Sequence, residues 1–313
     1  MIHPLSRVSS VLCCALYASI LSWAQQGPAI AWQQTFGDDF TEQAEGIWCM
    51  ADGAVVVAGS VFATEGVGKG TVGDWDARVW KVDAQGALVW ERTFGGSATD
   101  KAMAVIGSPA GGFRVVGHTD SADGDVEGAI GGSDVWLLEL DAEGALLGQR
   151  CYGGSSTDEA WDMAATADGG CVIVGHSNSM DGQVGPTAGG SDYWVLRLNA
   201  TGDIVWQRSV GGSLADEAWA VDVAPDGGFY VAGSTSSVDG DFGGSAGEED
   251  YGIVRLSADG ALVWQRTLGG SWRDQATAIR SRTAGGCVVG GITFSSDGDV
   301  TEQGGQGDGW LVA

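Results

Sequence analysis

The sequence predicts an all-β protein built from five copies of a four-stranded unit. A segment of the type W-x-R-x-x-G-G-S recurs with starts near residues 32, 90, 148, 206 and 264, so every interval is 58 residues. Each period holds four short runs rich in Val, Ile, Leu and Trp, which turn residues separate, and the runs lack the apolar stripe of a helix. A fixed period of this length with four strands per copy is typical of the blades of a β-propeller.

The second copy shows the four expected strands in chain order. They are run a at Ala87–Phe94, run b at Ala102–Ser108, run c at Gly112–Thr119 and run d at Asp134–Asp141. Tight turns such as Asp168–Gly170 join runs b and c, and glycine there suits the left-handed backbone of a hairpin loop. The longer c–d loops emerge at the same end of the strands as the a–b loops, so we expect binding residues on that face.

The order of the runs indicates how the ring closes. The repeats begin with a run a at 29–36 and end inside a run d at 308–313. If run b is innermost and run a outermost, the last blade lacks only an outer strand, which the N-terminal run supplies. We therefore expect five four-stranded blades, closed by the N-terminal strand in the last blade. The alternative is a fragment of a larger propeller, because the last run d stops abruptly at Ala313.

The N-terminal segment has the features of a secretory signal. Residues 1–24 combine an early Arg7 with an apolar stretch and small residues at Ser22 and Ala24. We expect cleavage near Ala24, with an uncleaved anchor as the alternative. The predicted organisation is a signal peptide at 1–24 and one propeller domain at 25–313, and the expected location is secreted or at the cell surface.

The net charge of −26 narrows the range of partners. A surface this negative repels phosphate backbones and anionic lipid, so we expect neither nucleic-acid binding nor membrane insertion after signal cleavage. Cations and neutral ligands fit better, and we expect a monomer.

Four cysteines follow the signal, namely Cys49, Cys151, Cys171 and Cys287. Cys171 and Cys287 stand where Phe113 and Phe229 stand in other repeats, which indicates small buried hydrophobic side chains. We expect free thiols, with disulfides as the alternative in an exported protein.

Aspartates of the c–d loops are the candidate metal ligands. The Asp-Gly-Asp turns of three copies supply Asp123, Asp125, Asp239, Asp241, Asp297 and Asp299. Hard oxygen ligands at this density suit Ca²⁺, which is the one cofactor expected. The alternative is that each aspartate binds the backbone N–H groups of its own loop.

A candidate binding rim follows from residues after the a–b loop. Asp158 and Asp216 lie beside Trp161 and Trp219, and aromatic platforms next to carboxylates suit a sugar ligand. The alternative is packing between blades. His118 and His176 end run c in two copies and are expected to be structural.

The repeats resemble a known type of tandem repeat. The segments WQRSVGGS, DGGFYVAGST and GGSDYWVLRL are similar to those of secreted bacterial β-propeller repeats, to the bacterial seven-bladed-propeller-type repeat and, distantly, to WD40. The resemblance covers residues 29–313 and implies a propeller.

No catalytic motif such as a Ser/His/Asp set stands out, and the copies are nearly interchangeable, so we expect no enzyme. The favoured function is an exported scaffold that binds an unknown protein or glycan, with Ca²⁺ as a candidate stabilising ion. The alternative is a lectin-like propeller, and the third candidate is a glycoside hydrolase.

Overall fold

The computed structural model describes residues 30–37, 41–62, 74–244, 247–301 and 306–313. The chain divides into a short unit, 1–33, and a large unit, 34–313, which contains every strand that the structure describes. The predicted signal peptide at 1–24 lies outside the described residues. Within those residues no helix is long and apolar enough to cross a bilayer.

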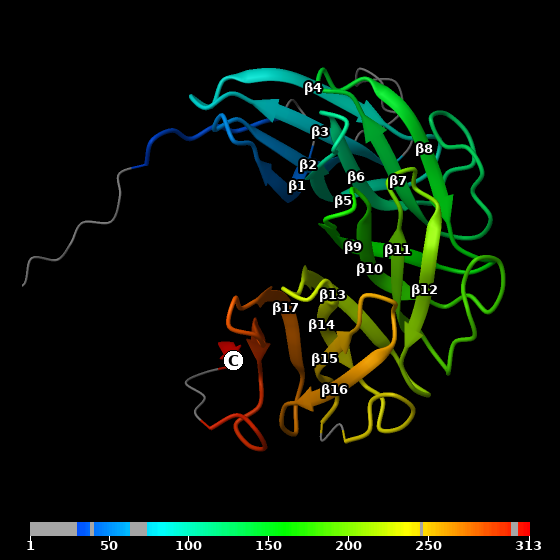
Figure 1. The fold of residues 1–313 in the computed structure, drawn as a ribbon, viewed down its shortest axis with the longest axis vertical. Coiled ribbons are helices and arrows are strands. Elements are labelled where there is room, and N and C mark those ends of the chain that lie inside the picture. The colour runs from blue at the N-terminus through cyan, green and yellow to red at the C-terminus, as the bar shows by residue number, and fades with distance from the viewer. Residues whose placement is uncertain (1–29, 38–40, 63–73, 245–246, 302–305) are drawn as a thin grey trace, which may run out of the picture. The chain divides into compact units, whose positions relative to one another are not determined.

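The large unit consists of five successive antiparallel sheets (Figure 1). The first four sheets each have four strands in sequential order. They are β1 (Thr41–Cys49), β2 (Val55–Phe62), β3 (Trp75–Val82) and β4 (Leu88–Phe94); β5 (Asp100–Gly107), β6 (Phe113–Thr119), β7 (Asp134–Leu140) and β8 (Leu146–Tyr152); β9 (Asp158–Ala165), β10 (Cys171–Ser177), β11 (Asp192–Leu198) and β12 (Ile204–Val210); and β13 (Asp216–Val223), β14 (Phe229–Thr235), β15 (Asp250–Leu256) and β16 (Leu262–Leu268).

The fifth sheet has three strands, β17 (Asp274–Ser281), β18 (Cys287–Thr293) and β19 (Asp308–Val312). The four runs predicted for the second copy coincide with β4 to β7 to within two residues at each end. The all-β fold of repeated four-stranded units, with the architecture of a propeller, is therefore confirmed.

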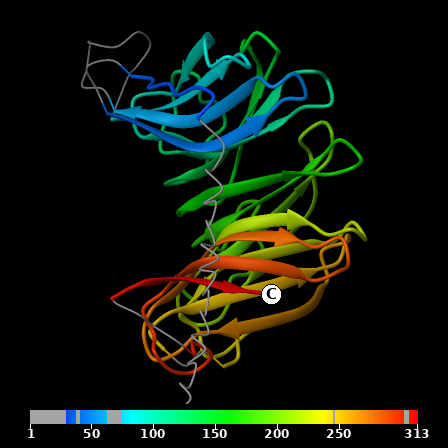
Figure 2. The same cartoon turned by 90° about the vertical axis from the view of Figure 1, so that its left-hand side faces the viewer.

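The sheets pack face to face around their first strands. β1 packs against β5, β5 against β9, β9 against β13 and β13 against β17, so these five inner strands lie side by side (Figures 1 and 2). Four apolar clusters fill the joints between successive sheets. Trp136 and Trp194 on the third strands are about 1% exposed and belong to the first two clusters, where such large buried rings contribute strongly to packing.

The predicted closure by an N-terminal strand is wrong for the structure described. Residues 30–37 form no strand, and the fifth sheet has no outer strand among the described residues. Phe36 instead stacks on Trp80 of β3, in the first sheet, with ring centroids 6.0 Å apart. This contact holds the segment on the first sheet, so the five sheets do not close into a ring. That the repeats belong to a larger propeller stays a prediction.

All four cysteines outside the predicted signal are free thiols, as expected. Cys171 and Cys151 are buried, Cys287 is half-buried and Cys49 is exposed. Burial raises the pKa of the Cys171 thiol to about 11, so it stays protonated and packs as a hydrophobic side chain.

Candidate functional site

Each inner strand has a one-residue bulge at the same repeat position. In β9 the pairing with β10 moves from Ala160 directly to Asp162, which leaves Trp161 without an opposite residue. The same shift occurs in the other inner strands, where the extra residues are Glu45, Met103, Trp219 and Thr277. A bulge redirects the extra side chain and is a common device beside binding sites.

The five bulge residues all line one cavity of about 660 Å³. The five inner strands form its wall, and its volume lies in the range usual for small-molecule sites, about 300–1,000 Å³. The scaffold repeats every 58 residues, but the five bulge positions carry four different residue types. The cavity is therefore asymmetric even though the blades are alike.

Trp161 and Trp219 form an aromatic pair in this cavity. Their ring centroids are 4.6 Å apart, with planes inclined by 40°. Trp161 Nε1 donates to His176 Nδ1 at 3.3 Å, and Trp219 Nε1 donates to Ser234 Oγ at 3.4 Å. These bonds fix both indole rings, and each ring stays partly exposed. The pair is a pre-formed surface on which a flat or cyclic ligand can stack.

Two histidines and a carboxylate surround Trp161. Its ring stacks on His176 and meets His118 edge-on, at centroid distances of 6.4 and 5.8 Å. Burial, and to a smaller extent the Lys101 cation, lower the pKa of His118 to about 4. Burial also lowers the pKa of His176, although Glu159, with Oε2 4.0 Å from Nε2, acts in the opposite direction. Both imidazoles are therefore neutral at pH 7.

Asp162 and Asp222 connect neighbouring inner strands in the wall of the cavity. Each stands at a repeat position where the other four copies have no aspartate. Asp162 Oδ2 accepts from the backbone N–H of Val221 at 2.9 Å, and Asp222 Oδ2 accepts from that of Ser281 at 2.6 Å. Burial raises the pKa of Asp162, and its bonds to backbone N–H groups partly offset the rise. Arg280 adds a positive charge to the same wall.

Two of the four predicted rim residues are not presented to a ligand. Asp158 and Asp216 are 0% exposed, beneath the loops rather than on them. Asp158 accepts hydrogen bonds from Ser177 Oγ, from Ser179 Oγ at 2.8 Å and from the backbone N–H of Gly154 at 2.7 Å. The structure thus separates the four residues: the tryptophans line the cavity, and the aspartates hold the loops together.

The aspartates proposed for Ca²⁺ accept hydrogen bonds from backbone N–H groups of the neighbouring a–b loop, rather than from their own c–d loop. Asp123 Oδ1 accepts from the backbone N–H of Ser97 at 2.7 Å, and Asp125 Oδ2 from that of Gly95 at 3.2 Å. In the third copy the neutral Gln183 makes the Asp125-type bond to Gly153, also at 3.2 Å. The same bonds recur in the other two copies, through Asp239, Asp241, Asp297 and Asp299.

A neutral replacement shows that the position serves a hydrogen bond rather than a charge. Within the described part of the chain, His, Cys, Asp and Glu side chains form no group of three that could hold a metal ion. The residues present therefore fit a hydrogen-bonded link between two loops better than a Ca²⁺ site.

Comparison with known proteins shows one relative in sequence. The chain is 31% identical over 180 residues to Regulatory protein FlaEY of Caulobacter vibrioides, a match that covers 54% of this chain and 19% of that protein. The chain thus spans about a fifth of this relative. No family model matches the chain, so the specific repeat type suggested by the sequence is not confirmed, whereas a propeller-like repeat fold is.

Two solved structures resemble the fold. One is a "putative gluconolactonase", with a TM-score of 0.38 and 12% identity, covering 82% of this chain and 89% of that chain. The other is the Synechocystis apocarotenoid oxygenase, with a TM-score of 0.38 and 12% identity, covering 75% of this chain and 52% of that chain.

The expectation that the protein is not an enzyme is contradicted by these comparisons. The two structures just described are a "putative gluconolactonase" and an oxygenase, although a likeness at 12% identity concerns the fold alone and transfers no reaction. That expectation rested on the near-identity of the five copies. The copies differ, however, at the positions that line the cavity.

Sequence reasoning missed the lining of the cavity apart from its two tryptophans. It identified Trp161 and Trp219. It did not identify Glu45, Asp162 or Asp222, each of which is an acidic residue found in only one of the five copies at its repeat position. A signal was present, since these positions vary from copy to copy inside otherwise regular strands. The acidic neighbour of His176, Glu159, was missed as well.

Proposed function

We propose that this chain is an exported propeller that binds a saccharide in the cavity of the inner strands. The observation that carries the proposal is the pair of bulge residues, Trp161 and Trp219, fixed at 4.6 Å in an asymmetric cavity of about 660 Å³. Aromatic walls with a few polar groups that fix orientation are the usual composition of small-ligand sites.

The chemistry of the lining suits a neutral polyhydroxylated ring. The apolar face of a sugar ring stacks on indole, and carboxylates such as Glu45 and Asp222 accept hydrogen bonds from hydroxyl groups. A phosphorylated or sulfated glycan is disfavoured by the net charge of −26. Export rests on the predicted signal at 1–24, and fractionation of the native host tests it: the protein is expected outside the cytoplasm, without residues 1–24.

A glycan array tests the binding proposal. Wild-type protein is expected to bind a subset of neutral glycans, and Trp219→Ala to lose at least about tenfold in affinity because the stacking surface is removed. Trp272→Ala is the matched control, since Trp272 is 58% exposed and does not line the cavity. An array that stays silent with folded wild-type protein contradicts the proposal.

The aspartates of the same cavity support a second candidate, hydrolysis of the bound glycan. Glycosidases use two carboxyl groups, one of them with a raised pKa that serves as the acid. Burial raises the pKa of Asp162 as this role requires, and Asp222 provides a second carboxylate in the wall. Release of reducing ends from the glycans that bind, abolished in both Asp162→Asn and Asp222→Asn, is the expected result. Binding without release excludes this candidate and leaves the first.

A further inference from the structure

The four joints between successive sheets use the same pair of repeat positions. One position lies on the third strand of a sheet, and the other lies on the first strand of the following sheet. The two residues of each pair belong to one apolar cluster: Val79 and Val105, Leu137 and Met163, Val195 and Val221, and Ile253 and Ile279. None of these side chains is more than 5% exposed, so each pair is part of the buried centre of its joint.

The same two positions occur once more, at the two ends of the series of sheets (Figure 1). Leu311 on β19, in the fifth sheet, is equivalent to Ile253, and Ile47 on β1, in the first sheet, is equivalent to Val105. Leu311 is 73% exposed and Ile47 is 68% exposed. The chain therefore presents the two halves of a fifth joint on two separate faces, and both halves are open to solvent.

The strands around Leu311 and Ile47 are exposed in the same way. Val288 on β18 is half-buried, whereas the equivalent Val56 and Val172 are 0% exposed. Every residue of β1 is exposed or half-buried, whereas most residues of β5 are buried. Apolar sheet faces that stay open in this way are typical of interaction sites rather than of ordinary surface.

The charges on the two faces have opposite signs. Arg280 on β17 is exposed, and the equivalent Ala164 packs in the joint to the following sheet, so Arg280 lies on the side that a following sheet would cover. Glu45 on β1 is exposed, and the equivalent Trp161 meets His118 of the preceding sheet, so Glu45 lies on the side that a preceding sheet would cover. Opposite charges on the two halves favour their encounter and orient it.

We propose that the fifth sheet of one copy of this chain docks on the first sheet of a second copy, with Leu311 against Ile47 as in the four internal joints. Because both residues are exposed, the two halves do not meet within one chain. A second copy carries the face that completes each half. The two faces are different patches, so the contact is head-to-tail and can recur at the other end of each copy.

Sedimentation velocity of the full chain, over about a hundredfold range of concentration, tests the proposal. Wild-type protein is expected to assemble as its concentration rises. Leu311→Asp should raise the dissociation constant at least about tenfold, because a carboxylate then enters the apolar joint. Leu147→Asp is the matched control and should assemble like wild type. Leu147 is 68% exposed, and the equivalent Val89, Val205 and Val263 are exposed as well, so this position faces solvent in each of these copies.

A mixing experiment separates the two faces from a general effect of added charge. Ile47→Asp should also block assembly, and it replaces Leu311→Asp if that variant does not fold. An equimolar mixture of the two variants should form a dimer, because one supplies an intact fifth sheet and the other an intact first sheet. A wild-type monomer at every concentration overturns the proposal. So does a folded Leu311→Asp or Ile47→Asp variant that assembles like wild type, or a mixture of the folded variants that stays monomeric.

Discussion

Asp192 shows how one buried carboxylate makes the stability of this fold depend on pH. Its Oδ2 accepts from the backbone N–H of Ala188 at 2.6 Å, while Oδ1 has no hydrogen-bond partner in the described part of the chain. Oδ1 of Asp192 and Oδ2 of Asp216 both approach Gly211, where an added Cβ would lie 2.1 and 2.9 Å from them. Burial, together with the negative charge of the neighbouring Asp216, raises the pKa of Asp192 to about 6.

The raised pKa predicts that stability falls as pH rises. The folded state binds the proton of Asp192 more tightly than the unfolded state, in which the pKa of this carboxyl is near 3.8. The contribution of this proton to the free energy of unfolding is therefore complete below about pH 4 and is lost as the pH rises past 6. A shift of this size lowers the free energy of unfolding by about 2 kcal/mol between pH 4 and pH 8. Burial moves the pKa of Asp100 and Asp134 in the same direction.

Asp192→Asn is expected to be more stable than wild type at pH 8 and equal to it or less stable at pH 4. The neutral amide keeps the bond to Ala188 N–H and can donate toward Asp216. Urea unfolding at the two pH values measures the change. Asp52→Asn, at an exposed turn, is the control and should follow wild type; a pH dependence unchanged by Asp192→Asn would refute this assignment.

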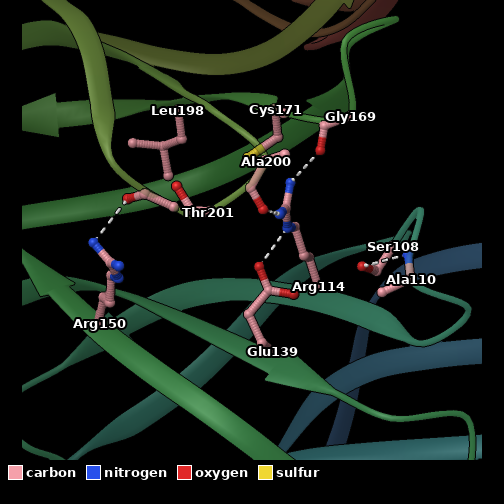
Figure 3. A network of polar contacts seen from close by, with 12 residues as sticks. Ser108, Ala110, Arg114, Glu139, Arg150, Gly169, Cys171, Leu198, Ala200 and Thr201 are labelled. Atoms are coloured by element: carbon pink, nitrogen blue, oxygen red, sulfur yellow. Dashed lines mark hydrogen bonds and ion pairs between the residues drawn. The ribbon is translucent and has the colours of Figure 1, made fainter.

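Neighbouring sheets are joined by hydrogen bonds as well as by apolar packing. Arg114 on β6 is 2% exposed; it pairs with Glu139 on β7 and donates to Gly169 O at 2.9 Å and to Ala200 O in turns of the third sheet (Figure 3). The side chain therefore joins the second sheet to the third.

Arg114→Met is expected to lower the free energy of unfolding by about 2–4 kcal/mol, because it leaves two carbonyls and the Glu139 carboxylate without this donor. The surface pair of Arg273 and Glu249 offers the comparison: Arg273→Met should cost at most about 1 kcal/mol, since an exposed ion pair contributes little. Chemical denaturation measures both variants. Equal losses in the two would show that the joint does not depend on Arg114.

The strands were predictable from the sequence because period, turn glycines and β-branched runs all repeat. The bulges were not, because a one-residue change of register leaves no mark in composition or alternation until the partner strand is known. For the same reason Trp161 was assigned to the loop face rather than to the cavity wall. The closure failed at Phe36, where a contact with the first sheet decides the position of a segment whose pattern alone fits the fifth.

At the scale of the whole molecule, charge is the dominant feature. The chain carries 41 acidic and 15 basic residues, so the folded state repels itself. Raising NaCl from about 10 to 500 mM is expected to raise the melting temperature by roughly 2 °C or more, since salt screens that repulsion. Sucrose is the control, because it stabilises proteins without screening charge. It should raise the melting temperature of wild type and of a variant with fewer acidic residues by the same amount. A melting temperature that falls with NaCl would contradict this account.

The central claim is that a repeated scaffold presents one asymmetric binding cavity at its bulges. Equilibrium titration of the tightest neutral glycan from the array against wild type, the double variant Trp161→Ala/Trp219→Ala and Trp272→Ala tests it most directly. The account predicts one site per chain, loss of binding in the double variant and wild-type affinity for Trp272→Ala. Undiminished binding by a folded double variant would place the ligand elsewhere and contradict the claim.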